Sequence, residues 1–335
     1  MKKILVTGGL GYIGSHTVVV LQEAGFEVVI VDNLSNTTIS VLDNIFQITG
    51  VKPDFFEIDL KDTQKVNAFF EKVKIDGIIH FAAFKAVGES VQKPLSYYRN
   101  NIVGLLNVLE AMEKYAIKHF IFSSSCTVYG QADKMPIDER TPLKKPESPY
   151  GRTKAMGEDI INDFVNITRI SAIALRYFNP VGAHKSALLG DIPNGIPNNL
   201  LPYITQTATG IREQLVVFGD DYSTKDGTAI RDYIDVNDLA KAHLLALQYL
   251  LANKNNANLE FFNLGSGNGS TVLEIINAFE KANGVKIPYT ISSRRSGDIQ
   301  EAYADFSNAK TKLNWQPTTS LETSMKTAWE FQKKL

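Results

Sequence analysis

The sequence lacks the features of disulfide-stapled, strongly charged or membrane-spanning proteins. Its 335 residues include one cysteine, Cys126, which cannot form an internal disulfide and fits a reducing, cytoplasmic compartment. The 35 basic and 36 acidic residues leave a formal net charge of -1, so neither nucleic acid nor a membrane surface is expected as a partner. No apolar run approaches the roughly 18 residues of a membrane span. The short run after Met1 enters glycines at once, which favours a core strand over a signal peptide.

Metal-ligand patterns and repeats are missing as well. The five histidines are scattered at positions 16, 80, 119, 184 and 243 without the spacing of a metal site, so no metal is expected. With 44% hydrophobic residues, a chain of this length can bury a large core without disulfides or metals. We therefore expect one large domain or two intimate ones.

Short apolar runs alternate with helical patterns through the first 180 residues. Strands are expected at 4–6, 28–31, 55–58, 77–80, 119–122 and 170–176, and the first helix at 12–24. Such all-apolar runs are typical of parallel strands that are buried on both faces. The pattern predicts an α/β fold with a doubly wound parallel sheet of the Rossmann type.

The character of the chain changes after residue 180. Residues 181–232 are rich in glycine, proline and asparagine and contain few periodic segments, which indicates a smaller, interleaved C-terminal substrate domain. A helix at 235–251 and a strand at 261–264 are expected to return to the sheet, and a further helix is expected at 271–283. The first domain is therefore predicted at 1–180, rejoined by about 234–265, and the second at 181–233 and 266–335.

The first predicted turn carries three glycines, Gly8, Gly11 and Gly14, as G-x-x-G-x-x-G between a strand and a helix. Glycines there permit a tight turn and let the backbone approach a pyrophosphate, which the helix N-terminus then binds. A glycine-rich turn without any ligand is the alternative. The position between the first strand and the first helix favours the dinucleotide site.

Asp32 ends the second predicted strand, 18 residues after Gly14. A carboxylate there accepts hydrogen bonds from the adenosine ribose and repels a 2′-phosphate, so NAD is favoured over NADP. A turn-forming role remains open for Asp32 and for its neighbour Asn33. Asp59 at the end of the third strand is ambiguous for the same reason.

Tyr150 and Lys154 stand four residues apart, just after Pro149, which suits the start of a helix. Residues at that spacing share a helix face. An ammonium beside a phenol favours the phenolate, so the pair predicts a tyrosine with a lowered pKa that acts as a general base. Such a pair also occurs by chance on helix surfaces, but the dinucleotide motif upstream favours catalysis.

Three serines, Ser123, Ser124 and Ser125, follow the fifth predicted strand. Ligands bind at the carboxyl ends of parallel strands, so one of these hydroxyls can contact the reacting group, although a plain turn would also contain serines. Cys126 is expected to be a small buried residue, because no histidine lies near it in the sequence to activate a thiolate.

Several longer segments together resemble a known family. The segments are 7–16 and 31–34 around the glycine turn and Asp32, 80–90, 148–151, 176–184, 196–200, 226–228 and 230–234. They resemble the extended short-chain dehydrogenase/reductases and, over essentially the full chain, their UDP-glucose 4-epimerase family. The resemblance implies an isomerase with tightly bound NAD and a UDP-sugar substrate. It would interconvert UDP-glucose and UDP-galactose by hydride transfer at sugar carbon 4 through a 4-keto intermediate.

The resemblance also implies roles for individual residues. The catalytic residues would be Tyr150, Lys154 and Ser125. The NAD contacts would be Gly8, Gly11, Tyr12, Ile13, Gly14, Asp32, Asn33, Asp59, Leu60, Phe81, Ala82, Lys85, Asn100, Ser125, Tyr150, Lys154 and Phe178. The UDP-sugar contacts would be Lys85, Ser125, Tyr150, Asn179, Asn199, Leu200, Val216, Phe218, Arg231, Tyr233, Arg295, Asp298 and Ala302. The domain 1–180 would bind NAD and the second domain UDP-sugar.

Ala302 departs from the family, whose members carry a tyrosine or a cysteine at the matching wall of the sugar pocket. The smaller side chain implies that UDP-GlcNAc and UDP-GalNAc are also substrates. The family further implies a homodimer through helices at 96–115 and 150–167.

Two other functions are weighed against epimerisation. A 4,6-dehydratase of nucleotide sugars needs an acid and a base, which that family places directly after its central threonine; here Cys126 and Thr127 follow Ser125. A non-catalytic NAD-sensing protein would have no use for a tuned pair such as Tyr150 and Lys154. Both alternatives are therefore less favoured.

Overall fold

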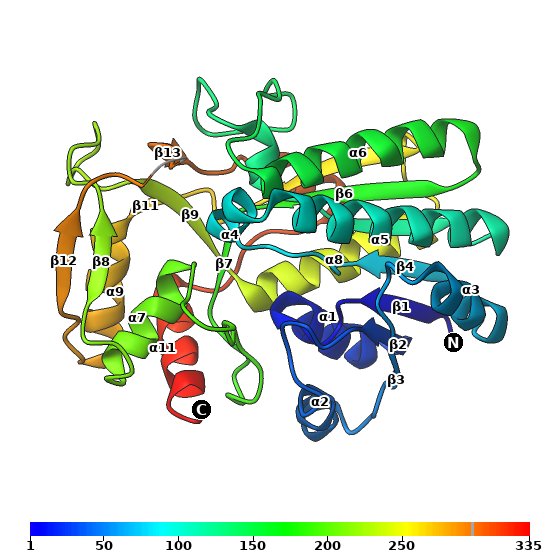
Figure 1. The fold of residues 1–335 in the computed structure, drawn as a ribbon, viewed down its shortest axis with the longest axis horizontal. Coiled ribbons are helices and arrows are strands. Elements are labelled where there is room, and N and C mark those ends of the chain that lie inside the picture. Colours follow the sequence, from blue (N-terminus) through cyan, green and yellow to red (C-terminus); the bar gives the residue numbers. More distant parts are fainter. Residues whose placement is uncertain (296–297) are drawn as a thin grey trace.

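A seven-stranded parallel sheet forms the centre of the molecule (Figure 1). The computed structural model describes residues 1–295 and 298–335. The strand order is β10-β6-β5-β4-β1-β2-β3. The strands are β1 (Lys3–Thr7), β2 (Glu27–Asp32), β3 (Asp54–Glu57), β4 (Gly77–His80), β5 (His119–Ser123), β6 (Ser171–Tyr177) and β10 (Leu259–Leu264). The predicted doubly wound parallel sheet is confirmed.

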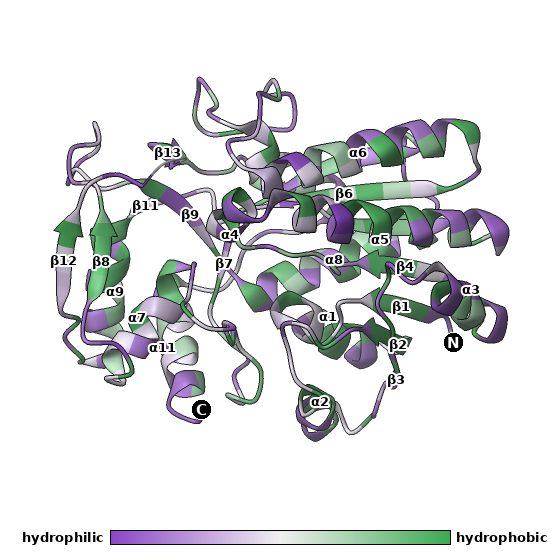
Figure 2. Cartoon of the chain, in the orientation of Figure 1, coloured by the Kyte–Doolittle hydropathy of each residue, from purple (hydrophilic) through white to green (hydrophobic). Residues whose placement is uncertain are grey.

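Helices cover both faces of this sheet. One layer contains α1 (Tyr12–Glu23), α2 (Val41–Thr49), α8 (Val236–Leu251) and α10 (Ser307–Leu313). The other contains α3 (Thr63–Lys72), α4 (Val87–Gln92), α5 (Pro94–Lys114) and α6 (Pro149–Ile167). Figure 2 shows hydrophobic segments in the strands and hydrophilic segments in many loops. Within the described residues, no helix is long and apolar enough to cross a membrane.

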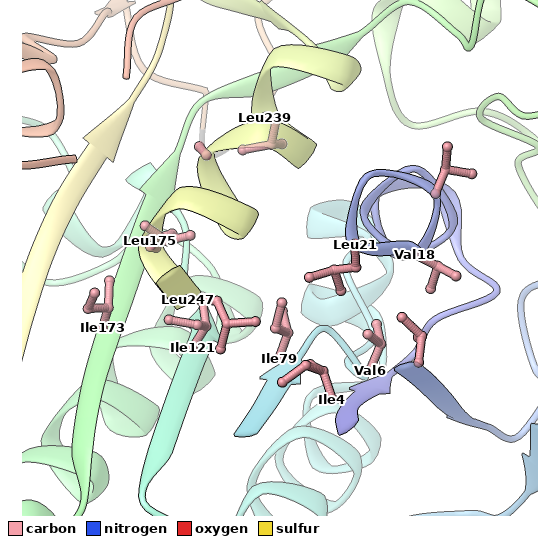
Figure 3. Close-up of a cluster of buried hydrophobic side chains, with 14 of the residues drawn as sticks. Ile4, Val6, Val18, Leu21, Ile79, Ile121, Ile173, Leu175, Leu239 and Leu247 are labelled. Carbon is pink, nitrogen blue, oxygen red and sulfur yellow. The ribbon is translucent and has the colours of Figure 1, made fainter. Parts of the chain in front are cut away.

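Alternate residues of the strands pack into two separate hydrophobic cores, one on each face of the sheet. Ile4 and Val6 of β1 face α1 and α8, where they pack with Leu21 and Leu247 (Figure 3). Leu5, between them, faces the core under α3, α5 and α6. Because side chains alternate across a strand, an all-apolar run supplies both cores at once.

A smaller lobe is built from the second half of the chain. Four short strands form one sheet in it: β7 (Asn179–Val181), β9 (Ile230–Asp235), β11 (Gly269–Thr271) and β13 (Glu301–Ala302). β8 (Leu215–Phe218) and β12 (Tyr289–Ser292) pair separately, and α7 (Leu200–Ala208), α9 (Val272–Asn283) and α11 (Leu321–Gln332) pack around a third core. The chain enters this lobe after β6 and returns to the large sheet through α8 and β10. It then leaves again, and α10 packs once more against the large sheet before α11.

Candidate active site

A cavity of about 1280 Å³ lies between the carboxyl ends of the central strands and the small lobe. Most of the residues singled out from the sequence line it. These are Gly8, Gly11, Tyr12, Ile13, Gly14, Asp32, Asn33, Asp59, Leu60, Phe81, Ala82, Lys85, Asn100, Tyr150, Lys154, Asn179, Asn199, Leu200, Val216, Phe218, Arg231, Tyr233, Arg295, Asp298 and Ala302. Ser125 and Phe178 do not belong to the lining; both are buried directly behind it.

The turn between β1 and α1 has room only for glycine. Gly8 has a φ of +69°, and a Cβ there would lie 2.8 Å from the backbone nitrogen of Ala82. A Cβ on Gly14 would lie 2.3 Å from the carbonyl oxygen of Gly8. Gly11 caps α1 without a side-chain hydrogen bond, so the N–H groups of the first helical turn face the cavity unshielded. This cradle fits a pyrophosphate, as the glycine spacing predicted.

Asp32 closes the far side of this turn. Its carboxylate accepts hydrogen bonds from the backbone N–H groups of Leu10, at 3.1 Å, and Leu34, at 3.0 Å. Burial raises the pKa of Asp32, and these backbone hydrogen bonds partly oppose the rise. Asp59 lies nearby on the cavity wall and is paired with the Lys61 ammonium at 3.2 Å.

Lys154 reaches from α6 to the end of β5. Its Nζ donates to the carbonyl oxygen of Ser123 at 2.5 Å and lies 5.9 Å from the ring centre of Tyr150. Burial lowers the pKa of Lys154 to about 7, and the Glu158 carboxylate one turn further along α6 opposes this change. The Tyr–Lys spacing thus brings both side chains to the cavity, but the ammonium is held by the serine segment.

The pKa of Tyr150 is shifted in the direction opposite to the prediction from the sequence. In the chain alone, burial raises the pKa of Tyr150 above its ordinary value, as does the neighbouring Tyr177, while a hydrogen bond with Ser125 lowers it. The prediction of a lowered pKa considered the Lys154 charge and omitted the loss of solvent around a fully buried phenol. A positive charge close to the ring would oppose that shift.

Ser125 and Cys126 lie at the start of the short 3-10 helix η1 (Cys126–Tyr129). Ser125 Oγ accepts hydrogen bonds from the backbone N–H and the hydroxyl of Thr127, at 3.2 and 3.0 Å. Cys126 is half-buried rather than fully buried and borders the cavity. Burial raises the pKa of its thiol to about 12, so Cys126 is no thiolate nucleophile at neutral pH.

Two arginines and an aromatic ring form the small-lobe end of the cavity. Arg295 forms two hydrogen bonds with Asp298, at 2.8 and 3.1 Å, and its guanidinium lies 5.7 Å from the ring centre of Phe218. Arg231 lies 3.9 Å from the same Asp298 carboxylate. Tyr233, two residues along β9, is buried, which raises its pKa to about 12. Two forked donors that share one carboxylate are suited to a diphosphate.

Ala302 forms part of the apolar wall between these two ends. It pairs with Arg231 across β13 and β9 and packs with Phe178 and Val128. The next residue, Tyr303, is absent from the cavity lining and lies against Gly269 of β11, where a Cβ would come within 3.0 Å of the tyrosine ring.

Asp191 was not predicted from the sequence. Its carboxylate pairs with Lys85 at 3.3 Å and accepts a longer hydrogen bond from Asn199 at 3.4 Å. Asp191 therefore links the loop that follows β4 to the start of α7. Tyr12 also bridges the lobes by donating to the Gly182 carbonyl oxygen at 2.6 Å. Asp191 lies in a stretch rich in glycine and proline, and no local spacing marks it.

No group of three or more potential metal ligands occurs among residues 1–295 and 298–335.

A parallel sheet with a glycine cradle after β1 and a Tyr–Lys pair on α6 defines an extended short-chain dehydrogenase/reductase. The family model for GDP-mannose 4,6 dehydratase, which describes such proteins, matches residues 5–328. The chain belongs to the UDP-glucose 4-epimerase family, whose members match it over nearly its full length.

Three relatives illustrate the match. UDP-glucose 4-epimerase of Pasteurella multocida (strain Pm70) is 51% identical over 332 residues, which cover 99% of this chain and 97% of that protein. The crystal structure of UDP-glucose-4-epimerase from Stenotrophomonas maltophila, with bound NAD and formylated UDP-arabinopyranose, has a TM-score of 0.96 and 45% identity, covering 100% of this chain and 98% of that chain. The UDP-Glc/GlcNAc 4-epimerase from Campylobacter jejuni has a TM-score of 0.85 and 38% identity, covering 100% of both chains.

Proposed function

We propose that the protein interconverts UDP-glucose and UDP-galactose with a retained NAD, through a 4-keto sugar intermediate. One observation carries this proposal: the pair Tyr150 and Lys154 borders a single cavity between the glycine cradle and the two arginines. A dinucleotide at one end and a UDP-sugar at the other would meet at Tyr150. The family membership of the chain supports the same function.

The dinucleotide end of the cavity fits NAD. The cradle around Gly8 and Gly14 suits a pyrophosphate, and the Asp32 carboxylate suits unphosphorylated ribose hydroxyls. When bound, NAD would supply the hydride acceptor for carbon 4 and a positive charge that favours the phenolate of Tyr150.

The residues of the chain would move the proton and hold the sugar. Tyr150 would take the proton of the sugar 4-hydroxyl and later return it, acting as general base and then as general acid. Ser125, whose side chain lowers the pKa of Tyr150, would complete the proton path to the sugar oxygen. Lys154 would stabilise the phenolate by its charge and anchor the dinucleotide.

The arginines would bind the diphosphate of the substrate. Arg231 and Arg295 now share the Asp298 carboxylate, so a diphosphate would find two donors already held in place. Phe218, which is 40% exposed, would contact the uridine. Firm binding at this end would leave the hexose free to turn over near Tyr150.

The range of sugars would extend to the N-acetylated pair, UDP-GlcNAc and UDP-GalNAc. Ala302 contributes only a methyl group to the cavity wall, which leaves room for a 2-acetamido group. The similarity to an epimerase that acts on both UDP-Glc and UDP-GlcNAc supports this part of the proposal.

The ligand of each domain, the cellular compartment and the oligomeric state belong to the same proposal. Residues 1–180 with about 234–265 would hold NAD, and 181–233 with 266–335 would hold the UDP-sugar. The protein would act in the cytoplasm as a homodimer through α5 and α6, whose solvent-facing surfaces expose Leu95, Leu106 and Met156.

Incubation with UDP-galactose as the only added compound tests the main proposal. We expect UDP-glucose to form without added NAD, identified by chromatography against standards. A keto-deoxy sugar would instead show a 4,6-dehydratase, and no conversion at all would leave an NAD-binding protein without catalysis. Either result would overturn the proposal.

A further inference from the structure

The central serine of the Ser123–Ser125 segment has a buried partner of its own. Ser124 Oγ donates to Glu158 Oε1 at 2.5 Å, and its backbone N–H donates to the Leu175 carbonyl oxygen at 3.0 Å. Glu158 stands four residues after Lys154 on α6, one turn further from Tyr150. Both Lys154 and Glu158 therefore bond to the serine segment from the same helix, on adjacent serines.

Glu158 is in turn fixed by Arg176 of β6. The guanidinium donates from Nε to Oε1 at 2.9 Å and from Nη2 to Oε2 at 2.6 Å, a forked pair whose side chains are 4% and 3% exposed. Arg176 also donates to Tyr129 Oη at 3.0 Å, and Tyr129 donates to Asn263 Oδ1 at 2.7 Å. The Phe261 ring covers the guanidinium at 4.2 Å.

Such a pair is a poor device for stability alone. The cost of removing two charges from water often exceeds their attraction, and well-packed apolar residues of similar volume stabilise a core as well or better. The Glu158–Arg176 pair holds two hydroxyls that apolar residues could not hold, those of Ser124 and Tyr129, and only the Ser124 hydroxyl belongs to the serine segment. Along the chain, Ser124 stands between Ser123, whose carbonyl oxygen accepts from Lys154, and Ser125.

We propose that Glu158, with Arg176 as its counter-ion, is a positioning residue that fixes the Ser123–Ser125 segment against α6. The proposal rests on the proposed epimerase function. The carboxylate holds Ser124, and this sets where the Ser123 carbonyl meets Lys154 and where the Ser125 hydroxyl meets Tyr150. Glu158 itself is absent from the cavity lining, so it would act through Ser124 and not on the reacting groups.

Two uncharged double variants separate positioning from stability. Glu158→Gln with Arg176→Met removes both charges but keeps an acceptor oxygen for Ser124. Glu158→Leu with Arg176→Met has similar volume and no acceptor. We expect both to fold with similar melting temperatures. We expect the first to keep kcat for UDP-galactose within about threefold, and the second to lose about tenfold or more with little change in KM, because small misplacements of catalytic groups are costly.

Ser124→Ala removes the other partner of the same hydrogen bond and leaves the ion pair intact. It should lower kcat as the leucine variant does, and adding it to the leucine variant should cause no further loss, since both remove one interaction. Equal kcat in the two double variants, or full activity in Ser124→Ala, would overturn the positioning role. A wild type without epimerase activity would overturn the proposed function itself, so the two failures are distinguishable in one assay.

Discussion

The Lys154 ammonium is bonded to the Ser123 carbonyl oxygen at 2.5 Å, and its distance to the ring centre of Tyr150 is 5.9 Å. The lysine thus lies close enough to act on the phenol by charge while a backbone carbonyl fixes its position. Because Lys154 and Tyr150 are both buried, water screens this charge weakly.

Tyr150→Phe should reduce turnover of UDP-galactose by roughly 10²–10⁴-fold, the usual loss on removing a general base. The substitution removes one hydroxyl and little volume, so NAD should stay bound. Initial rates and the NAD content of the purified variant check both expectations. A rate near that of the wild type would show that another group takes the proton.

Lys154→Met keeps most of the side-chain length and removes the charge. Without the ammonium the phenolate of Tyr150 is less favoured, so the acid limb of the pH–activity profile should move to higher pH. The expected measurement is kcat from pH 5 to 10 with NAD occupancy, which should fall as well. An acid limb at the wild-type position would contradict the role of the charge.

Asp32→Ala should weaken the preference for NAD over NADP. The carboxylate repels a 2′-phosphate, and its loss removes that repulsion. Competition between the two dinucleotides for protein stripped of cofactor gives the ratio of affinities. Asp32→Asn is the matched control, since it removes the charge while keeping an acceptor for Leu10 and Leu34. Equal binding of NAD and NADP by the wild type would already refute the argument.

Ala302→Tyr should remove most turnover of UDP-GalNAc and spare that of UDP-galactose. A phenol at this wall would occupy the space of the 2-acetamido group, and overfilling a packed pocket is costly. Tyr303→Ala is the control, because that ring lies against Gly269 outside the cavity lining. If the wild type consumes UDP-galactose but not UDP-GalNAc, the broader substrate range is wrong.

His243→Leu should reduce the loss of stability in acid. Burial lowers the pKa of His243 to about 4, and among the described residues its Nε2 has no hydrogen-bond partner. The unfolded chain, with a histidine pKa near 6.5, binds more protons between these values. Stability therefore falls as pH drops from 6.5 towards 4, by about 1.4 kcal/mol per pH unit for this group. Urea unfolding at pH 7.5 and pH 5 checks the smaller pH dependence of the variant; an unchanged difference would count against it.

Local spacing carried most of what the sequence could predict. The strands are short continuous apolar runs, the glycine turn and the Tyr150–Lys154 pair depend on residues a few positions apart, and Asp32 stands at the end of such a run. These patterns are visible in a linear chain. Asp191 and the Glu158–Arg176 pair escaped notice because their partners are distant in sequence. The direction of the Tyr150 pKa shift was missed for a related reason, since burial depends on every element that covers the ring.

The order of strands along the chain has a consequence for synthesis. β10 borders β6 in the finished sheet, yet it follows the small-lobe residues 181–232 in the sequence. Until residue 264 has been made, β6 is an open edge of seven residues, five of them buried in the finished fold. An unpaired apolar edge invites pairing with another chain. Fragments that stop near residue 180 should therefore aggregate, and the nascent protein is most vulnerable to self-association while the segment between β6 and the end of β10 is being translated.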